Sequence, residues 1–567
     1  MLETVKKDII SAIAKAAKLA PHEVAELIEE PKDTALGDLA LPCFRLAAKF
    51  RTSPQNIAKD IAAKMPKLKS VKMVHVVGPY INFFLSSSNL AENVLTEVYK
   101  AKDKFGAGTK KAEKVMIEFS QPNTHKSFHI GHLRGTTTGN SLVNIMKFSG
   151  YPVIAANYIG DIGAHVAKWL WFYTKFYKNS IPKKNIDKWL GKIYADADKK
   201  YKSHEKYHEE VAEVLKKLEA GDKKLIKLWQ QTRKLSLAVF NEAYKLLGVD
   251  FDIMFYESEV EKPGKKIVSE LVKKGLAKKD QGAMIIDLKK YDLDVFLLLK
   301  SDGSSLYSTK DLALAKLKFE KYKINKSIYV VAQEQTHYFK QLFKTLELMG
   351  FKQAAKCYHL AYGLVLLHGK KMASRAGEII MFEDLFKQAK NNALEEVWSR
   401  NQNIHEATAE KIAEKIALAA LKYGVLKQSA DKTIDFDFER ALAFEGDTGP
   451  YLQYSLVRAK KILQKVKAKP SLKVSFDVLK TNEELALTKQ ISNFKEIVAK
   501  AVEQYAPNMI ANYAYELTQV FNTFYEKCPV AKADAKTRAA RILLVWAFAQ
   551  TLRNALNLLG IEEVEVM

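Results

Sequence analysis

The sequence is poor in cysteine and contains no long apolar run. Its three cysteines, Cys43, Cys357 and Cys528, lie far apart and form no CxxC pair or histidine-rich spacing that could hold zinc. We therefore expect free thiols in a reducing compartment and no bound zinc. No apolar stretch approaches the about 20 residues needed to span a bilayer, so we also expect no membrane partner.

The amino-terminal segment lacks the features of a targeting signal. MLETVKKDIISAIAKAAKLA mixes Glu3 and Asp8 with lysines. It has neither the apolar core of a signal peptide nor the Arg-rich, acid-poor character of a transit sequence. The pattern predicts an ordinary amphipathic helix, and we expect a cytoplasmic protein.

Acidic residues are outnumbered by basic ones. The chain of 567 residues has 65 Asp and Glu against 90 Lys and Arg, a formal net charge of +25. The positive electrostatic field of such a charge favours a polyanionic partner, and nucleic acid is the first candidate. A high net charge also serves solubility. The length and the 48% hydrophobic composition permit several cores. We expect roughly three or four structural units.

The first unit is predicted over residues 1–110 as a small α+β domain. It starts with helical periodicity and ends in VKMVHVVGPYINFFLS, where β-branched and aromatic residues flank a turn at Gly78 and Pro79. The polar, glycine-bearing segment AKDKFGAGTKKAEK then predicts a linker.

A strand, turn and helix alternation starts at VMIEFS and predicts an α/β domain over residues 111–440. The strand YPVIAANYIG follows, and SIYVVAQ later resumes the pattern. Lys- and Glu-rich helices over about 167–285 predict a helical insertion between them. From about residue 405 almost every segment has helical periodicity, so we expect an all-α helix bundle over residues 441–567.

The strongest local signal follows the strand VMIEFS. His129, Ile130, Gly131 and His132 stand where the next helix should begin. A helix amino terminus offers free N–H groups and a partial positive charge, and a glycine there lets a ligand approach the backbone. Two imidazoles could donate hydrogen bonds to phosphate oxygens, and Lys126 could add a charge. Alone, four such residues more often indicate structural histidines beside a helix cap.

A second basic segment, GKKMASRAGE, follows the apolar strand YGLVLL. Glycines and cations in a mobile loop suit a clamp that closes on phosphates. Its candidate phosphate-binding residues are Lys371, Ser374 and Arg375. Alone, this loop is more often a hairpin with solvated lysines.

Together, HIGH and the later Lys371-Met372-Ala373-Ser374-Arg375, similar to KMSKS, resemble the class I aminoacyl-tRNA synthetases. Within that class the chain resembles the arginyl-tRNA synthetase family over nearly its whole length. The segments that carry this resemblance are FSQPNTHKSFHIGHLRG, ANYIGDIGAH, SDGSSLYSTKDLALAK, VVAQEQTHYFKQLF, FEGDTGPYLQYSLVRA and LRNALNLLGIEEVEVM. Ala373 and Gln121 depart from the pattern, since the family often has Ser at both places.

The resemblance implies a Rossmann-like catalytic domain that activates L-arginine with ATP and transfers it to tRNA(Arg). Mg²⁺ would accompany ATP as substrate, the chain would be a monomer, and the first step would require tRNA. His129, His132, Lys126 and Lys371 would stabilise the α-phosphate transition state and the departing pyrophosphate. Gly131, Ser374 and Arg375 would complete the ATP site.

An arginine site needs a carboxylate and further acceptors in one plane, because a guanidinium is planar, charged and rich in donors. Tyr307 and Asp311 are spaced i and i+4, share a helical face, and match the family's contacts with the arginine side chain. Alone, this pair more often marks a helix start. Asn123, His132, Gln335 and Gln121 match positions that hold the amino acid. Glu118 could add negative charge or simply end a strand.

The resemblance also implies two tRNA-contacting regions. Tyr80 and Asn82 in GPYINFF match residues that read the D-loop, although a buried strand aromatic is the commoner role. The first helix of the anticodon-binding domain offers Tyr451, Gln453, Tyr454 and Arg458, some of which must be core. We assign Trp546, within ILLVWAFA, to packing.

Three alternatives are less consistent with the sequence. A cysteine-specific class I synthetase would need zinc ligands that this chain lacks. A small HIGH-type nucleotidyltransferase would be shorter and lack the helical tail. A catalytically idle tRNA-binding paralogue would lose His129, His132 or Asp311, and all three are present.

Overall fold

The structure is a computed structural model that describes residues 2–31, 33, 36–177, 179–367, 370–371 and 381–566. The chain forms two compact units. Unit 1 comprises residues 1–106, 454–497 and 513–555, and unit 2 comprises residues 107–453, 498–512 and 556–567. In the described part of the chain, no helix is long and apolar enough to cross a bilayer.

The amino-terminal part of unit 1 is the expected α+β domain. Helices α1 (Leu2–Ala17) and α4 (Pro54–Lys64) pack on a sheet of order β1-β3-β2, formed by β1 (Leu39–Pro42), β2 (Val71–Val77) and β3 (Tyr80–Leu85). The predicted turn at Gly78 and Pro79 joins β2 to β3, and Val77 pairs with Tyr80. Gly78 has φ +55°, which explains the glycine.

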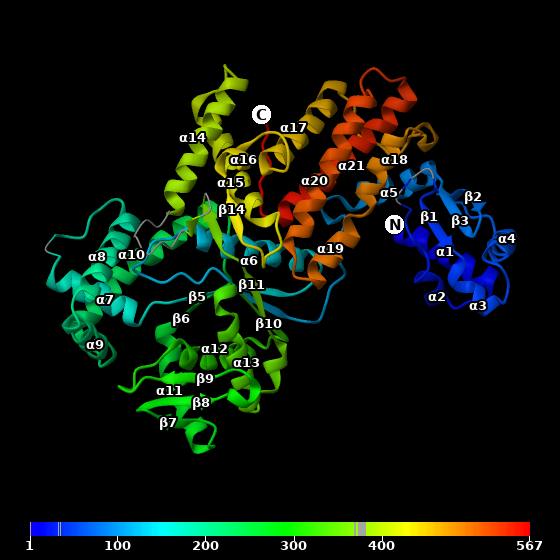
Figure 1. The fold of residues 1–567 in the computed structure, drawn as a ribbon. Coiled ribbons are helices and arrows are strands. Elements are labelled where there is room, and N and C mark those ends of the chain that lie inside the picture. Colours follow the sequence, from blue (N-terminus) through cyan, green and yellow to red (C-terminus); the bar gives the residue numbers. More distant parts are fainter. Residues whose placement is uncertain are drawn as a thin grey trace. The chain divides into compact units, whose positions relative to one another are not determined.

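Unit 2 is built on a parallel sheet (Figure 1). Its order is β11-β10-β4-β5-β6, with β4 (Val115–Glu118), β5 (Val153–Ile159), β6 (Ile253–Tyr256), β10 (Lys326–Ala332) and β11 (Cys357–Tyr362). Helices α6 (Ile130–Phe148), α12 (Tyr307–Tyr322) and α13 (Thr336–Leu348) connect or flank these strands. The chain runs from β4 toward β6 and then returns to β10 on the other side. The carboxyl ends of β4 and β10 therefore meet at a topological switch point, where α/β sheets bind ligands.

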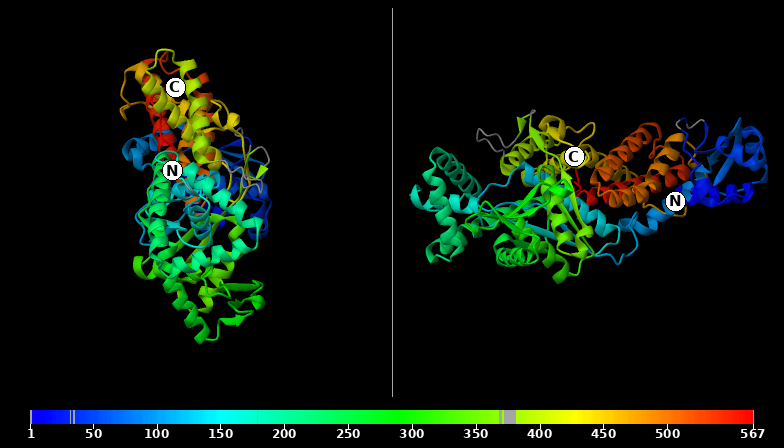
Figure 2. Two further views of the ribbon diagram at one scale, coloured as in Figure 1. Left: turned by 90° about the vertical axis from the view of Figure 1, so that its left-hand side faces the viewer. Right: turned by 60° about the horizontal axis from the view of Figure 1, so that its bottom comes forward.

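Four helices interrupt the α/β pattern: α7 (Ala164–Lys175), α8 (Ile186–Ser203), α9 (Lys206–Glu219) and α10 (Lys223–Leu247). The right view of Figure 2 shows them as one cluster at the left, beside the sheet. Their core contains Trp169, Leu170 and Trp189.

The helical insertion is shorter than the predicted 167–285. Strand β6 lies inside that range, yet it pairs with β5 in the main sheet. After helix α11 (Glu257–Lys273) a small antiparallel sheet follows, made of β7 (Lys278–Asp280), β8 (Ala283–Asp287) and β9 (Val295–Leu299). The short strand β6 was missed because charged helical sequence surrounds it.

The carboxyl-terminal region is helical, as predicted. Its main helices are α14 (Phe382–Arg400), α15 (Glu406–Leu426), α17 (Gly449–Val466), α18 (Asn482–Ser492), α19 (Phe494–Glu503), α20 (Pro507–Lys527) and α21 (Ala535–Leu558). Phe521 of α20 stacks on Phe548 of α21, with centroids 3.7 Å apart. One short strand, β14 (Ile434–Phe436), pairs with β12 (Val365–Leu367). Trp546 is partly buried against Tyr99.

Candidate active site

A cavity of about 640 Å³ lies at the switch point of the sheet. Its walls come from the ends of β4 and β10 and the starts of α6, α12 and α13. A volume of this size suits a small-molecule substrate. The residues expected in the site that line this cavity are Glu118, Gln121, Asn123, His129, Gly131, His132, Tyr307, Asp311 and Gln335.

The two histidines lie at the amino end of α6 and cap it reciprocally. His129 Nδ1 accepts a hydrogen bond from the Gly131 N–H at 3.1 Å, and His132 Nδ1 accepts one from the His129 N–H at 3.2 Å. The rings stack with centroids 3.9 Å apart. Because Nδ1 accepts in both rings, each neutral ring carries its hydrogen on Nε2. The pair therefore offers two Nε2–H donors.

Both histidines are neutral at physiological pH. Burial, together with the charge of Lys126, lowers the pKa of His129 to about 4. Burial, with His129 and Lys126, holds the pKa of His132 well below its ordinary value. Because both rings are neutral, Nδ1 stays the acceptor at the helix cap and Nε2–H stays free to donate in each ring.

Gly131 makes room for the His129 ring. A Cβ at this position would lie 2.9 Å from His129 Cε1 and 3.0 Å from its Nδ1. The sequence suggested that this glycine admits a ligand to the backbone. The structure gives a second reason, because the ring must fold back over Gly131 to cap the helix.

Lys126 lies beside the cavity and is not among its lining residues. Its ammonium lies 4.8 Å from the centroid of the Tyr194 ring. Burial and the nearby charge of Lys168 lower its pKa, while Asp198 opposes them. From this position the charge of Lys126 lowers the pKa of both His129 and His132.

The second basic motif is described only at its start. The backbone of Lys371 belongs to β13 (Lys370–Lys371), which pairs with β12 through Leu366. Ser374 and Arg375 lie outside the described residues, as does Ala373. Gly363 and Leu364, just before β12, and Val365, its first residue, line the cavity.

One carboxylate oxygen of Asp311 accepts a hydrogen bond, and the other has no hydrogen-bond partner among the described residues. Its Oδ2 accepts a hydrogen bond from the Tyr338 hydroxyl at 2.5 Å. Its Oδ1 and the Tyr158 hydroxyl are buried at this cavity and have no hydrogen-bond partner among the described residues, and the Tyr158 hydroxyl lies near enough to Asp311 to help lower its pKa. Burial raises the pKa of Asp311 to about 6, against the Tyr338 hydrogen bond and with the help of the Glu118 charge. Buried polar atoms without a protein partner are suited to binding a polar ligand.

Glu118 is the last residue of β4, one of the two roles considered for it, and its negative charge is paired. It forms an ion pair with Lys318, a lysine that the sequence did not single out. Its Oε1 accepts a hydrogen bond from Gln121 Nε2 at 2.8 Å. Glu118 therefore orients Gln121 within the cavity.

The backbone at the end of β4 is strained. Ser120 and Gln121 have φ angles of +78° and +45°, which cost roughly 1–3 kcal/mol each for residues with a Cβ. The Ser120 hydroxyl is held by Thr136 at 2.7 Å and by Tyr244 at 2.9 Å. This turn brings Gln121 into the cavity wall.

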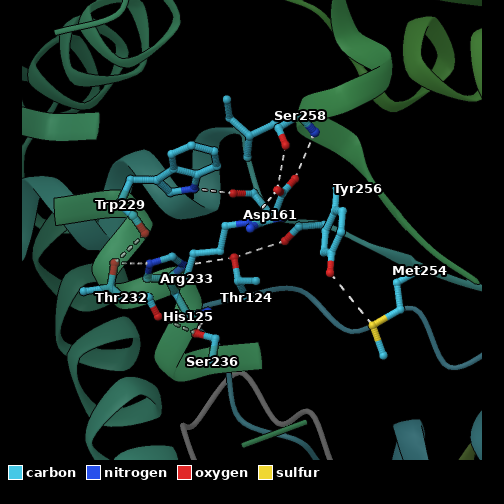
Figure 3. Close-up of polar contacts among 12 residues, drawn as sticks. Thr124, His125, Asp161, Trp229, Thr232, Arg233, Ser236, Met254, Tyr256 and Ser258 are labelled. Carbon is cyan, nitrogen blue, oxygen red and sulfur yellow. Dashed lines mark hydrogen bonds and ion pairs between the residues drawn. The ribbon is translucent and has the colours of Figure 1, made fainter. Parts of the chain in front are cut away.

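A buried network around Asp161 fixes the start of α11 (Figure 3). Asp161 accepts from Arg233 Nε at 2.7 Å, from the Ser258 N–H at 2.9 Å and from the Ser258 hydroxyl at 2.7 Å. The neighbouring Glu257 lines the cavity and pairs with Lys310 at 2.6 Å. Sequence reasoning missed Asp161 and Glu257, although Asp161 lies within the segment ANYIGDIGAH.

The two residues expected to read the D-loop differ in exposure. Tyr80 is partly exposed and lies edge-on to Phe44, with centroids 5.4 Å apart, and Phe44 is 52% exposed. Asn82 is buried at 4% exposure. This conformation therefore presents the two rings and not the amide.

The four residues proposed on α17 also differ in exposure. Gln453 is fully buried and donates to the carbonyl oxygens of Lys415 at 3.3 Å and Glu562 at 2.7 Å, so it serves packing in this conformation. Tyr451, Tyr454 and Arg458 are partly exposed. Arg458 donates to the Tyr454 hydroxyl at 3.2 Å. Periodicity did not reveal which face of this helix is buried.

The parallel sheet, the helix that starts at HIGH and the cavity at the switch point are those of a class I aminoacyl-tRNA synthetase. Three family models match in sequence order. "Arginyl tRNA synthetase N terminal domain" matches residues 3–85, "tRNA synthetases class I (R), catalytic domain" residues 94–439, and "DALR anticodon binding domain" residues 452–567. The chain belongs to the arginyl-tRNA synthetase family.

Known proteins resemble the chain over its whole length. An arginine–tRNA ligase of Clostridium perfringens is 35% identical over 565 residues, which cover 99% of this chain and 100% of that protein. The same enzyme of Bdellovibrio bacteriovorus is 35% identical, covering 99% and 97%. The structure of Thermus thermophilus arginyl-tRNA synthetase superposes with a TM-score of 0.82 at 27% identity, covering 99% and 100%.

Proposed function

We propose that the cavity of unit 2 carries out the arginine–tRNA ligase reaction. The carboxylate of L-arginine attacks the α-phosphate of ATP, giving arginyl-adenylate and pyrophosphate. A hydroxyl of the terminal adenosine of tRNA(Arg) then takes the arginyl group, and AMP leaves. The observation that carries this proposal is a single cavity with two Nε2–H donors on one wall and the open Asp311 Oδ1 on another.

The phosphate side consists of donors and positive charge. The Nε2–H groups of His129 and His132 bind phosphate oxygens as negative charge builds during attack on the α-phosphate. Lys126 adds positive charge from beside the cavity, and Mg²⁺ enters with ATP. Gly131, Lys371, Ser374 and Arg375 complete the ATP site in this proposal.

The arginine side consists of acceptors. Asp311 Oδ1 accepts from the guanidinium, whose charge it balances. Tyr307, at the start of α12, and Tyr158 supply hydroxyls next to it. Asn123, Gln121 and Gln335 hold the amino-acid end, which places the carboxylate toward the histidines.

The tRNA contacts are proposed on unit 1 and on the helical region. The amino-terminal domain, residues 1–110, offers Tyr80 and Phe44 as rings on which unpaired bases could stack. The helical domain, residues 441–567, offers Tyr451, Tyr454 and Arg458 for the anticodon. The net charge of +25 supports a tRNA partner. We propose a cytoplasmic monomer.

A charging assay tests the proposal. Purified protein, ATP, Mg²⁺ and unfractionated tRNA are incubated with each labelled amino acid in turn. Arginine alone should become attached to tRNA. Equal charging with lysine, or no charging with arginine, would refute the proposed function.

A further inference from the structure

The residue before Lys126 is a buried histidine that no proposed substrate contact uses. His125 is fully buried and is not among the described residues that line the cavity. Its backbone has a φ of +66°, in the left-handed region that residues with a Cβ rarely adopt. Such a conformation costs free energy and persists only where the surrounding structure enforces it.

Helix α10 of the helical insertion holds His125 in this conformation (Figure 3). The His125 N–H donates to Ser236 Oγ at 3.0 Å, and its Nε2 lies 2.8 Å from Thr232 Oγ1. Its Nδ1 lies 3.0 Å from Oγ1 of the preceding Thr124. The ring also packs on Trp169 of α7, with centroids 5.0 Å apart. These contacts fix both the backbone and the ring.

The His125 ring is neutral and fully hydrogen-bonded. Burial lowers its pKa to about 3. In a neutral imidazole one nitrogen donates and the other accepts, and a threonine hydroxyl can serve as the partner of either. Neither ring nitrogen therefore remains for proton transfer, so the role of His125 lies in what it holds.

The next two residues of the loop also lie on the insertion. The Lys126 ammonium lies 4.8 Å from the centroid of the Tyr194 ring on α8. The Ser127 hydroxyl donates to the Asp187 carbonyl oxygen, also on α8, at 3.4 Å. A Cβ at Gly191 would lie 2.1 Å from Ser127 Oγ, so α8 packs closely on this loop. Two helices of the insertion thus hold the three residues 125–127.

We propose that His125 is a positioning residue for the phosphate side of the site: its ring, held by α10, keeps the left-handed turn that directs Lys126 toward the α-phosphate of ATP. This inference rests on the proposed function of Lys126. The charge of Lys126 lowers the pKa of His129 and His132, so it already acts on the cavity wall that the phosphates would face. His125 acts through Lys126 and does not touch the substrate.

A glycine at position 125 separates the turn from the ring. Glycine adopts positive φ angles readily, so His125→Gly permits the turn but removes the ring and its contacts. We expect kcat/KM for ATP in tRNA charging to fall roughly tenfold or more, because Lys126 is no longer held in place, with the arginine KM changed less than about threefold. A native kcat/KM for ATP in His125→Gly would overturn the inference.

Lys126→Met separates positioning from general damage. If His125 acts through Lys126, adding His125→Gly to Lys126→Met should lower kcat/KM for ATP less than about threefold further. A second full loss in the double variant would overturn the inference. If Lys126→Met is defective and His125→Gly is native, the inference is wrong and the phosphate site stands. If Lys126→Met itself is native, the proposed role of Lys126 is wrong, and the inference with it.

Two threonines of the insertion give a matched comparison. Thr232→Val removes the hydroxyl beside His125 Nε2, and we expect kcat/KM for ATP to fall at least about threefold. Thr174→Val, on α7, is the control, because both hydroxyls donate to carbonyl oxygens of their own helices at 2.8 Å and 3.2 Å. It should behave as the native protein. If His125→Gly does not fold, this pair decides, and equal kcat/KM for ATP in the two threonine variants would overturn the inference.

Discussion

Tyr338 and Asp311 are joined by a hydrogen bond of 2.5 Å in which the tyrosine hydroxyl donates to Oδ2. Burial, with the charge of Asp311, holds the pKa of Tyr338 well above its ordinary value, so the hydroxyl keeps its hydrogen. The bond fixes the carboxylate and leaves Oδ1 as the oxygen open to a ligand. Tyr338 of α13 thus orients the carboxylate of Asp311 on α12.

The pH dependence of arginine use should report Asp311. Burial raises its pKa to about 6, so the carboxylate is lost as the pH falls through that value. The charged groups around it are Glu118, Glu257 and Lys318. We expect kcat/KM for arginine to fall about tenfold per pH unit below about pH 6. His129, with a pKa of about 4, should not contribute to this limb. A flat profile down to about pH 5 would contradict the assignment.

Gly160→Ala should disturb the amino-acid end of the cavity. A Cβ at Gly160 would lie 2.1 Å from Asn123 Oδ1, so the amide must move. We expect the arginine KM to rise about tenfold while the ATP KM stays nearly constant, as for loss of one substrate hydrogen bond. Steady-state charging kinetics measure both. In an Asn123→Ala background the same substitution should add little, and a full additional effect there would show that Gly160 acts elsewhere.

The histidine pair should affect the chemical step. His129→Ala and His132→Ala each remove one Nε2–H donor and also one acceptor that caps α6. We expect kcat for charging to fall about 10²–10³-fold in each variant, as for loss of one transition-state donor. Because the two rings stack and cap the same helix start, the double variant should lose less than the product of the two single losses. His405→Ala, at an exposed helix start, is the control. A native kcat in His132→Ala would exclude the role.

Arg134 should hold the wall of the cavity in place. It is fully buried, and its guanidinium donates to the carbonyl oxygens of Gly363 at 2.6 Å, Leu364 at 2.9 Å, Ala430 at 2.9 Å and Lys432 at 2.6 Å. Arg134→Met removes one donor from each of these carbonyls, of which Leu364 and Ala430 keep the backbone N–H groups of Ile434 and Gly363, and we expect a loss of about 3–5 kcal/mol in the free energy of unfolding. Urea unfolding measures it. Arg134→Lys should lose less, and a loss below about 1 kcal/mol in Arg134→Met would contradict this role.

The sequence predicted the parts of the site that lie along one strand or one helix. The strand VMIEFS followed by HIGH placed both histidines at a helix start, and the i and i+4 spacing placed Tyr307 and Asp311 on one face of a helix, which is the start of α12. The helix starts followed from local sequence patterns, and the roles of these side chains followed from the resemblance to the arginyl-tRNA synthetase family.

The contacts between elements could not be predicted in this way. Tyr338 and Lys318 reach Asp311 and Glu118 from other segments, and their meeting depends on how helices pack on the sheet. The ion pair of Glu118 with Lys318 was not predicted, because the two residues are 200 positions apart in the sequence. The burial of Gln453 was missed for the same reason, because it donates to the carbonyl oxygens of Lys415 and Glu562 in other segments.

The most direct test of the account is arginine charging by Asp311→Asn, compared with Asp294→Asn, whose native side chain is 83% exposed. Labelled arginine transferred to tRNA is measured against arginine concentration at fixed ATP. We expect Asp311→Asn to raise the arginine KM at least about 100-fold, because a buried counter-ion is lost, and Asp294→Asn to behave as the native protein. An unchanged arginine KM in Asp311→Asn would show that this cavity does not bind the guanidinium.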